Sequence, residues 1–136
     1  MKLVLDTNTV VSGLLWHGAP RQILDLARSD SVTLFTSPEL LAELEDVLGR
    51  RKFAERLRAA QVTVDELVYG YAALATTIRA SKIKPVIKND PDDDKVLACA
   101  VAANAEIIAS GDGHLLDLKK YENIRILTVN QLLEEI

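Results

Sequence analysis

The hydrophobic positions of this chain form two alternating patterns: short apolar runs, and longer stretches with helical spacing. The short runs are rich in Val, Ile and Leu and are bounded by polar residues, which is typical of β-strands. They cover residues 3–5, 32–35, 83–87, 107–109 and 124–127. Pro85 lies inside the third run and cannot donate a ladder hydrogen bond, so we expect that strand to be short or at a sheet edge.

The helices are indicated mainly by their first residues. Ser37 and Asp90 each precede a proline, and Thr63 and Thr128 each open a capping box with Glu or Gln three residues later. The predicted helices cover residues 20–28, 38–49, 53–60, 63–80, 91–104 and 129–135, with a short one after Asn8. Strands separated by helices predict parallel βαβ units. We therefore expect an α/β fold, a three-layer α/β/α single domain over residues 1–136 with a central, mainly parallel sheet of about five strands.

Two acidic residues come just after predicted strands. Asp6 comes after the first strand, and Asp112 lies in a Ser-Gly-Asp-Gly sequence after the fourth. Ligands of such sheets bind outside the carboxyl ends of the strands, where the strand order reverses. A turn or a helix cap also explains either residue alone, but both leave the sheet at the same end.

A third acidic segment runs from Asp90 to Asp94 and leads into a helix that is apolar on every face. Acids in a first helical turn are favoured by the helix dipole, which accounts for one or two of them. Four acids in five residues exceed that need, and a cation would relieve their repulsion. Asp94 is nearest to the buried part of the helix, and Asp92 and Asp93 are alternatives within the same run.

A fourth candidate lies on the helix predicted over residues 38–49. Its leucines and valine share one face, and Glu43 and Glu45 flank the two edges of that face. Either glutamate could reach a cleft from the core boundary, and periodicity does not choose between them. Together with the other acids, they indicate an all-oxygen pocket that suits Mg²⁺ or Mn²⁺.

Composition narrows the class of protein. The chain has 136 residues, of which 49% are hydrophobic and 26% charged, which is typical of a globular domain and not of a disordered chain. One cysteine excludes a disulfide framework and a cysteine-based zinc site, and no apolar run is long enough to span a membrane. We therefore expect a cytoplasmic protein. A net charge of −4 argues against binding to nucleic acid through a general basic field.

Four segments, taken in order, resemble the PIN-domain nucleases, and in particular the branch regarded as toxins of toxin–antitoxin pairs. The resemblance spans essentially the whole chain. It rests on residues 5–15, on residues 37–44 with 51–53, on residues 90–98 and on residues 110–112. It implies a Mg²⁺- or Mn²⁺-dependent ribonuclease that hydrolyses RNA phosphodiester bonds with metal-activated water. It further implies an antitoxin protein as partner and, in many members, a homodimer.

The resemblance also implies roles for individual residues. Four acids match the metal-binding and catalytic positions: Asp6, Glu43, Asp94 and Asp112. Asn8 and Ser110 match positions that orient ligands or water, although threonine is commoner at the second. Three basic residues after the second acid are candidate RNA contacts: Arg50, Arg51 and Lys52.

Two other functions remain open on the residues alone. A phosphatase of the haloacid-dehalogenase type would use Asp6 as nucleophile, but it needs a second aspartate where Asn8 stands. The second is a PIN scaffold that binds metal, RNA or a partner protein with negligible turnover. Cys99 lies among alanines and valines and is expected to be a buried structural thiol, and His17 and His114 are expected to be loop residues.

Overall fold

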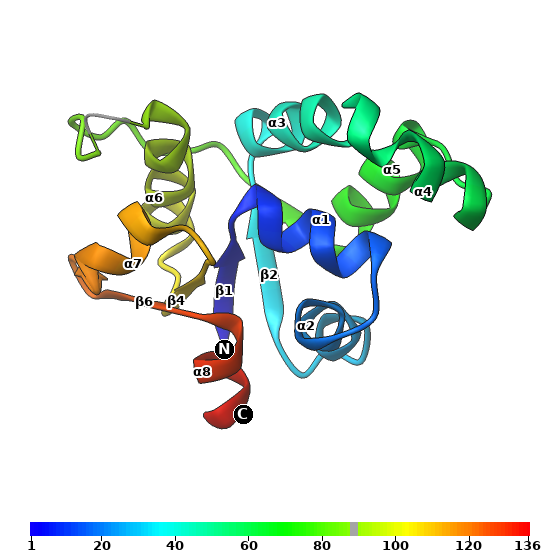
Figure 1. The fold of residues 1–136 in the computed structure, drawn as a ribbon. Coiled ribbons are helices and arrows are strands. Elements are labelled where there is room, and N and C mark those ends of the chain that lie inside the picture. Colours follow the sequence, from blue (N-terminus) through cyan, green and yellow to red (C-terminus); the bar gives the residue numbers. More distant parts are fainter. Residues whose placement is uncertain (88–89) are drawn as a thin grey trace.

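The computed structural model describes residues 1–87 and 90–136 and shows an α/β fold (Figure 1). Six strands form one sheet within these ranges, in the order β3-β2-β1-β4-β6-β5. The strands are β1 (Lys2–Leu5), β2 (Thr33–Thr36), β3 (Thr76–Thr77), β4 (Ile107–Ala109), β5 (Lys120–Tyr121) and β6 (Ile124–Leu127). All neighbours pair in parallel except β5 and β6. The expected α/β fold with a mainly parallel sheet is therefore confirmed, with six strands in place of about five.

Helices connect the strands and cover both faces of the sheet. They are α1 (Thr7–Leu15), α2 (Ala19–Arg28), α3 (Pro38–Leu48), the 3-10 helix η1 (Arg51–Phe53), α4 (Ala54–Ala60), α5 (Val64–Leu74), α6 (Pro91–Ala103), α7 (Gly113–Leu118) and α8 (Val129–Glu134). In Figure 1, α6 and α7 lie on one side of the strands and α1 to α5 on the other. The sheet between these two groups of helices gives the three layers, α/β/α.

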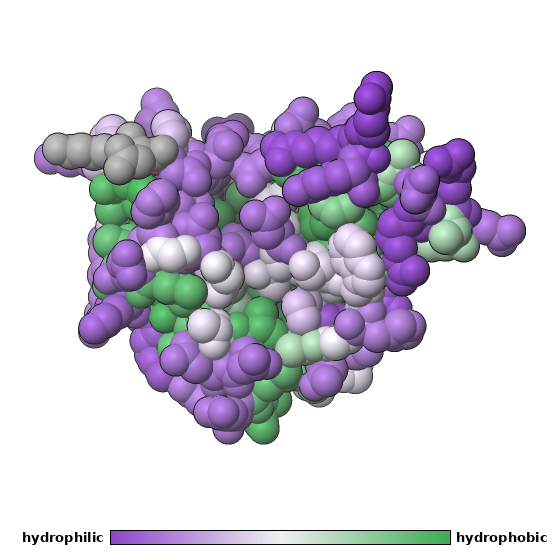
Figure 2. All heavy atoms as spheres, viewed as in Figure 1, coloured by the Kyte–Doolittle hydropathy of each residue, from purple (hydrophilic) through white to green (hydrophobic). Residues whose placement is uncertain are grey.

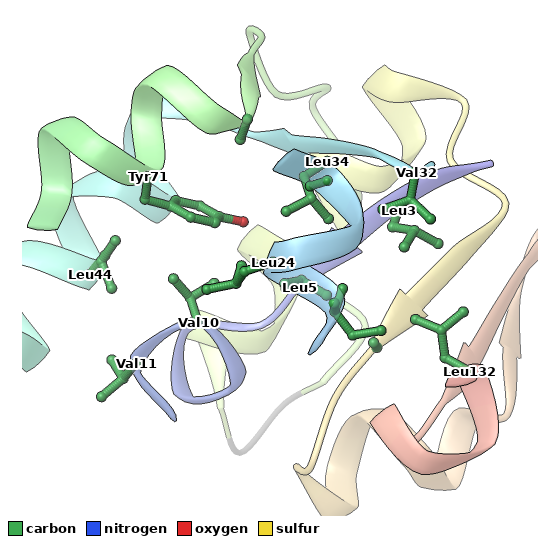
Figure 3. Packing of buried hydrophobic residues seen from close by; sticks show 14 of the residues in the cluster. Leu3, Leu5, Val10, Val11, Leu24, Val32, Leu34, Leu44, Tyr71 and Leu132 are labelled. Carbon is green, nitrogen blue, oxygen red and sulfur yellow. The ribbon is translucent and has the colours of Figure 1, made fainter. Parts of the chain in front are cut away.

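The strands divide their side chains between two cores, one on each face of the sheet. Leu3 and Leu5 point into the core beneath α1, α2 and α5, which Figure 3 shows with Leu24, Leu34 and Tyr71. Val4, between them, points into the core formed with α6 and α7. This alternation follows from the two-residue period of a strand, and it places α6 against the face opposite to α1.

Most helix starts agree with the capping signals. Ser37 accepts a hydrogen bond from the backbone N–H of Leu40, and both capping boxes form, at Thr63 and Thr128. The short helix expected after Asn8 begins earlier, at Thr7, because Asp6 and not Asn8 is its cap. Helix α7 and strand β5 were not predicted.

Two predictions around residues 75–87 were wrong. The helix expected over 63–80 ends at Leu74, because Thr76 and Thr77 pair with β2 as the edge strand β3. No strand forms over 83–87 in the described residues. The backbone N–H groups of Val86 and Ile87 instead donate to the carboxylate of Asp94.

Candidate metal centre

The carboxyl ends of β1 and β4 bring two acidic residues together. The two strands are neighbours in the sheet, and from β1 the chain goes to β2 on one side while β4 lies on the other. This is the point at which the strand order reverses. Asp6 follows β1 directly, and its backbone N–H donates to the carbonyl of Ala109 in β4 at 3.2 Å. Asp112 lies three residues beyond Ala109, at the start of α7.

A single buried hydroxyl connects these two acids. Ser110, which is 1% exposed, donates from Oγ to Oδ2 of Asp6 and accepts at Oγ from the backbone N–H of Asp112 at 2.9 Å. The other carboxylate oxygen of Asp6 caps α1 by accepting from the backbone N–H of Thr9 at 2.9 Å. Ser110 therefore fixes the orientation of one carboxylate and the backbone position of the other.

Asp93 supplies the third carboxylate, from the first turn of α6. Asp90 caps that helix, and Pro91 occupies its first position. Asp93 is only 7% exposed, and burial raises its pKa to about 7, with the nearby charges of Asp112 and Asp90 adding to the effect. Like charges held together out of water oppose ionisation, and such a shift is characteristic of sites that bind a cation or move a proton.

Glu43, on α3, supplies the fourth carboxylate. Burial is the main cause that raises its pKa, and the charge of Asp92 adds to it, while Thr7 and the ammonium of Lys95 act in the opposite direction. Lys95 Nζ lies 3.8 Å from Oε2 of Glu43 and 2.8 Å from Oδ1 of Asp92. Glu45 is exposed and does not line the pocket, so of the two glutamates that periodicity left open, the structure turns Glu43 toward the other acids.

These side chains line one cavity of about 490 Å³, which we call the carboxylate pocket. Among the described residues, three buried oxygens around it lack a hydrogen-bond donor: Oγ1 of Thr7, Oε2 of Glu43 and Oδ2 of Asp93. Unpaired buried oxygens are unfavourable unless another group satisfies them. Carboxylate and hydroxyl oxygens are the ligands that Mg²⁺ and Mn²⁺ prefer, so the residues present fit a divalent cation.

The structure does not bring Asp94 into this pocket, so the prediction that Asp94 and not Asp93 converges with the other acids was wrong. Its carboxylate accepts three hydrogen bonds from the backbone N–H groups of Val86 and Ile87, at 3.0 to 3.3 Å. Asp93, one position earlier, turns inward and lines the pocket. Asp94 therefore holds residues 86 and 87 against the helix, while Asp93 lies with Asp90 and Asp112 at the pocket.

Two further residues gather around Asp93. Ligand atoms of Asp90, Asp93, Asp112 and His114 all lie within 4.8 Å of one another. Nδ1 of His114 is 3.9 Å from a carboxylate oxygen of each of Asp93 and Asp112. His114 is thus beside the candidate centre. Its position two residues after Asp112 was the only sequence signal for this.

The other predicted site residues lie at the rim. Asn8 is exposed and lines both the carboxylate pocket and a second cavity beside Asp112. Arg50 also lines the pocket and pairs with Asp46 at 3.5 Å. Arg51 and Lys52 are exposed on η1, outside the pocket lining.

Two features outside the site also bear on the sequence predictions. Cys99 is buried, and burial raises the pKa of its thiol to about 12, so the thiol stays protonated at neutral pH. Across residues 1–87 and 90–136, every helix is too short or too polar to cross a bilayer.

Comparison with known protein families identifies the family of this chain. The sequence model of the PIN domain matches residues 2–114, which contain all the carboxylates described above. The chain belongs to the PIN-domain family. This PIN domain is also similar to the uncharacterized protein MJ1680 of Methanocaldococcus jannaschii, with 28% identity over 147 aligned positions that cover 99% of this chain and 91% of the relative.

A solved structure has the same fold. The crystal structure of VapBC2 from Rickettsia felis, bound to a DNA fragment from the promoter, contains a chain that superposes with a TM-score of 0.61. The match covers 93% of this PIN domain and 97% of that chain, at 18% identity. At this level of identity the similarity concerns the fold.

Proposed function

We propose that this PIN domain is a Mg²⁺- or Mn²⁺-dependent ribonuclease that hydrolyses RNA phosphodiester bonds in the cytoplasm. The observation that carries the proposal is the convergence of four carboxylates from separate segments on one pocket, with buried oxygens that lack donors. Membership of the PIN-domain family supports a nuclease. The choice of RNA rests on the resemblance of the sequence motifs.

Asp6, Glu43, Asp93 and Asp112 are the residues that would hold the cation. When bound, a divalent cation supplies positive charge to the phosphate and lowers the pKa of a water molecule that can attack phosphorus. The protein orients one of these carboxylates before a cation binds, because the hydroxyl of Ser110 donates a hydrogen bond to Asp6. Burial, with a contribution from neighbouring carboxylates, raises the pKa values of Glu43 and Asp93, and a cation in the pocket would favour their ionised forms.

The proposal extends to a toxin–antitoxin pair. VapBC2, whose chain shares this fold, is bound to promoter DNA in its crystal structure. We carry over a protein antitoxin as the expected partner of this chain, and a second copy of the chain as a further expected contact. Co-expression with the product of the adjacent gene, followed by co-purification, tests the antitoxin directly.

The nuclease is tested with purified protein stripped of metal by a chelator. A labelled single-stranded RNA of mixed sequence is incubated with this protein, with and without added Mn²⁺, and the products are separated on a sequencing gel. We expect cleavage with Mn²⁺, none with excess EDTA, and none in Asp6→Asn. The matched control is Asp25→Asn, which removes an exposed carboxylate on α2 that pairs only with Arg28 in the described structure.

The opposite result is equally informative. If the metal-loaded protein binds RNA but leaves RNAs of varied sequence intact, the nuclease proposal fails and a binding scaffold explains the pocket. Acid-stable phosphate on Asp6 after incubation with a phosphate ester would instead indicate the phosphatase.

A further inference from the structure

An exposed aromatic ring, that of Trp16, lies at the end of α1 and packs against the half-buried ring of Phe53. Trp16 remains 42% exposed and meets Phe53 edge to face, with ring centroids 6.0 Å apart and an interplanar angle of 61°. The guanidinium of Arg56 lies over the ring of Trp16, 5.8 Å from its centroid. Arg56 is itself held in place, because its Nε donates to the carbonyl of Leu15 at 2.7 Å.

Basic side chains surround these rings. Nζ of Lys52 lies 5.1 Å from the centroid of Phe53. Residues 50–58 contain five basic residues and one acidic residue, in a chain whose net charge is −4. Figure 2 shows strongly hydrophilic side chains crowded over the α3–α4 side of the molecule, next to paler side chains over α1. Five of the sixteen basic residues of this protein therefore lie in the segment that carries Phe53 and Arg56.

Two segments of the chain run from the carboxylate pocket to the rings of Trp16 and Phe53. Arg50 lines the pocket, and η1 with Phe53 follows it directly in the chain. Helix α1 starts at the pocket, where Asp6 caps it, and Trp16 is at its other end. Nine residues at a rise of 1.5 Å each give about 13 Å between the two ends. A polynucleotide strand in the pocket could reach the rings within a few nucleotides.

An exposed aromatic ring beside a cation that is held in place, such as Trp16 beside Arg56, is the kind of feature that binds an unpaired base. Bases stack on aromatic faces whatever their sequence, and the adjacent cations attract the phosphates. We propose that Trp16, with Phe53 and Arg56, is a stacking platform for a base of single-stranded RNA whose backbone runs past Arg50 into the carboxylate pocket. This inference rests on the proposed ribonuclease function and adds the way in which the substrate strand is held.

Trp16 is the only tryptophan in the chain, so its fluorescence reports on the platform directly. The experiment uses the full chain carrying Asp6→Asn, with Mg²⁺, and a single-stranded RNA 12-mer labelled at its 5′ end. Binding is measured by the anisotropy of the label, and stacking by the tryptophan emission of an unlabelled titration. We expect a saturable loss of emission with the same midpoint as the anisotropy curve.

Variants separate stacking from packing. In the same background, Trp16→Leu keeps an apolar side chain against Phe53 but removes the stacking surface, and we expect its Kd for the RNA to rise roughly 5- to 100-fold. Trp16→Phe retains a ring and should recover much of the affinity. The control is Tyr69→Leu, which removes another exposed ring, 76% accessible, from α5, and should leave Kd unchanged. Circular dichroism verifies that each variant is folded.

Three results would overturn the platform. The first is RNA binding without a change in tryptophan emission, with a Kd for Trp16→Leu equal to that of the Asp6→Asn background. If the wild type still cuts RNA in that case, the proposed function stands without the platform. The second is neither binding nor cleavage of RNA, in which case both proposals fail. The third is an emission maximum that shifts with protein concentration alone and not with RNA, which would assign this surface to a protein contact.

Discussion

Replacing Asp93 by asparagine removes one negative charge from the carboxylate pocket without changing the shape of the side chain. The same substitution at Asp94, the next residue, provides a matched control. Asp93 is buried among other carboxylates, whereas Asp94 accepts backbone hydrogen bonds from Val86 and Ile87. The two variants should therefore affect stability and metal binding in opposite ways.

The size of the effect follows from the pKa of Asp93 in metal-free protein. Burial and neighbouring charges raise that pKa from 3.8 to about 7. The folded protein then keeps a proton that the unfolded chain releases near pH 4, so the wild type loses stability as the pH rises from about 4 to about 7. The full shift sets an upper limit of about 4 kcal/mol. Solvent and relaxation reduce it, and we expect about 2 kcal/mol, or about 6 °C in Tm.

The assay is thermal unfolding followed by circular dichroism in chelator at pH 5, 6, 7 and 8. Asp93→Asn should lose less Tm than the wild type between pH 5 and pH 8, because Glu43 is then the remaining carboxyl with a raised pKa in the pocket, and it should exceed the wild type at pH 8. Asp94→Asn should lie below the wild type at every pH, by about 1–3 kcal/mol for disturbed backbone hydrogen bonds, and should keep the same slope with pH.

The effect of added metal on Tm then distinguishes the role of Asp93 from that of Asp94. Mn²⁺ at millimolar concentration should raise the Tm of the wild type and of Asp94→Asn, because a ligand that binds only the folded state stabilises it. It should have little effect on Asp93→Asn. A Tm of Asp93→Asn below that of the wild type at pH 8, or loss of the Mn²⁺ effect in Asp94→Asn alone, would refute the assignment of Asp93 to the pocket.

Three other predictions follow from single contacts. Ser110→Ala removes the hydroxyl that joins the two strand-end acids, and should weaken Mn²⁺ binding about tenfold by calorimetry, as is typical of residues that orient ligands; unchanged affinity would contradict that role. Lys95→Met leaves Glu43 without its ammonium, and should lower the Tm in chelator more than in Mn²⁺. Gly13→Ala places a methyl group 2.8 Å from Leu24 Cδ1 and should lower the free energy of unfolding by about 1–3 kcal/mol. Gly70→Ala has open space around the new methyl group and should raise that free energy by up to about 1 kcal/mol. Urea unfolding measures both.

The elements that could be predicted from the sequence are those whose signals are local. Ser37 with Pro38, and the capping boxes at Thr63 and Thr128, marked helix starts because a cap depends on only four neighbouring residues. The end of α5 was not predictable in this way. Apolar residues continue at helical spacing beyond Leu74, and only the presence of β2 beside Thr76 converts that stretch into a strand. Long-range pairing overrode the local pattern.

The choice between Asp93 and Asp94 failed for a related reason. Helix α6 is apolar on every face, so periodicity could not show which side points to the sheet. The signal that would have helped is the cap: with Asp90 as N-cap, Asp93 is the third helical residue and shares a face with Leu97 and Ala100, which are fully buried. Asp94 lies one residue further round the helix, where the backbone of residues 86 and 87 meets it.

The net charge of −4 first argued against a nucleic-acid partner, and the structure shows why a sum over the chain misleads. Asp6 and Asp93 are buried in the carboxylate pocket, where a divalent cation would neutralise them at close range. Of the basic residues at 50–58, Arg50 lines the pocket, and Arg51, Lys52 and Arg58 are exposed. An approaching phosphate backbone would therefore meet the exposed cations first and the acids only through bound metal. For the proposed ribonuclease, this arrangement predicts that rising salt weakens RNA binding through the basic residues while leaving Mn²⁺ affinity much less affected.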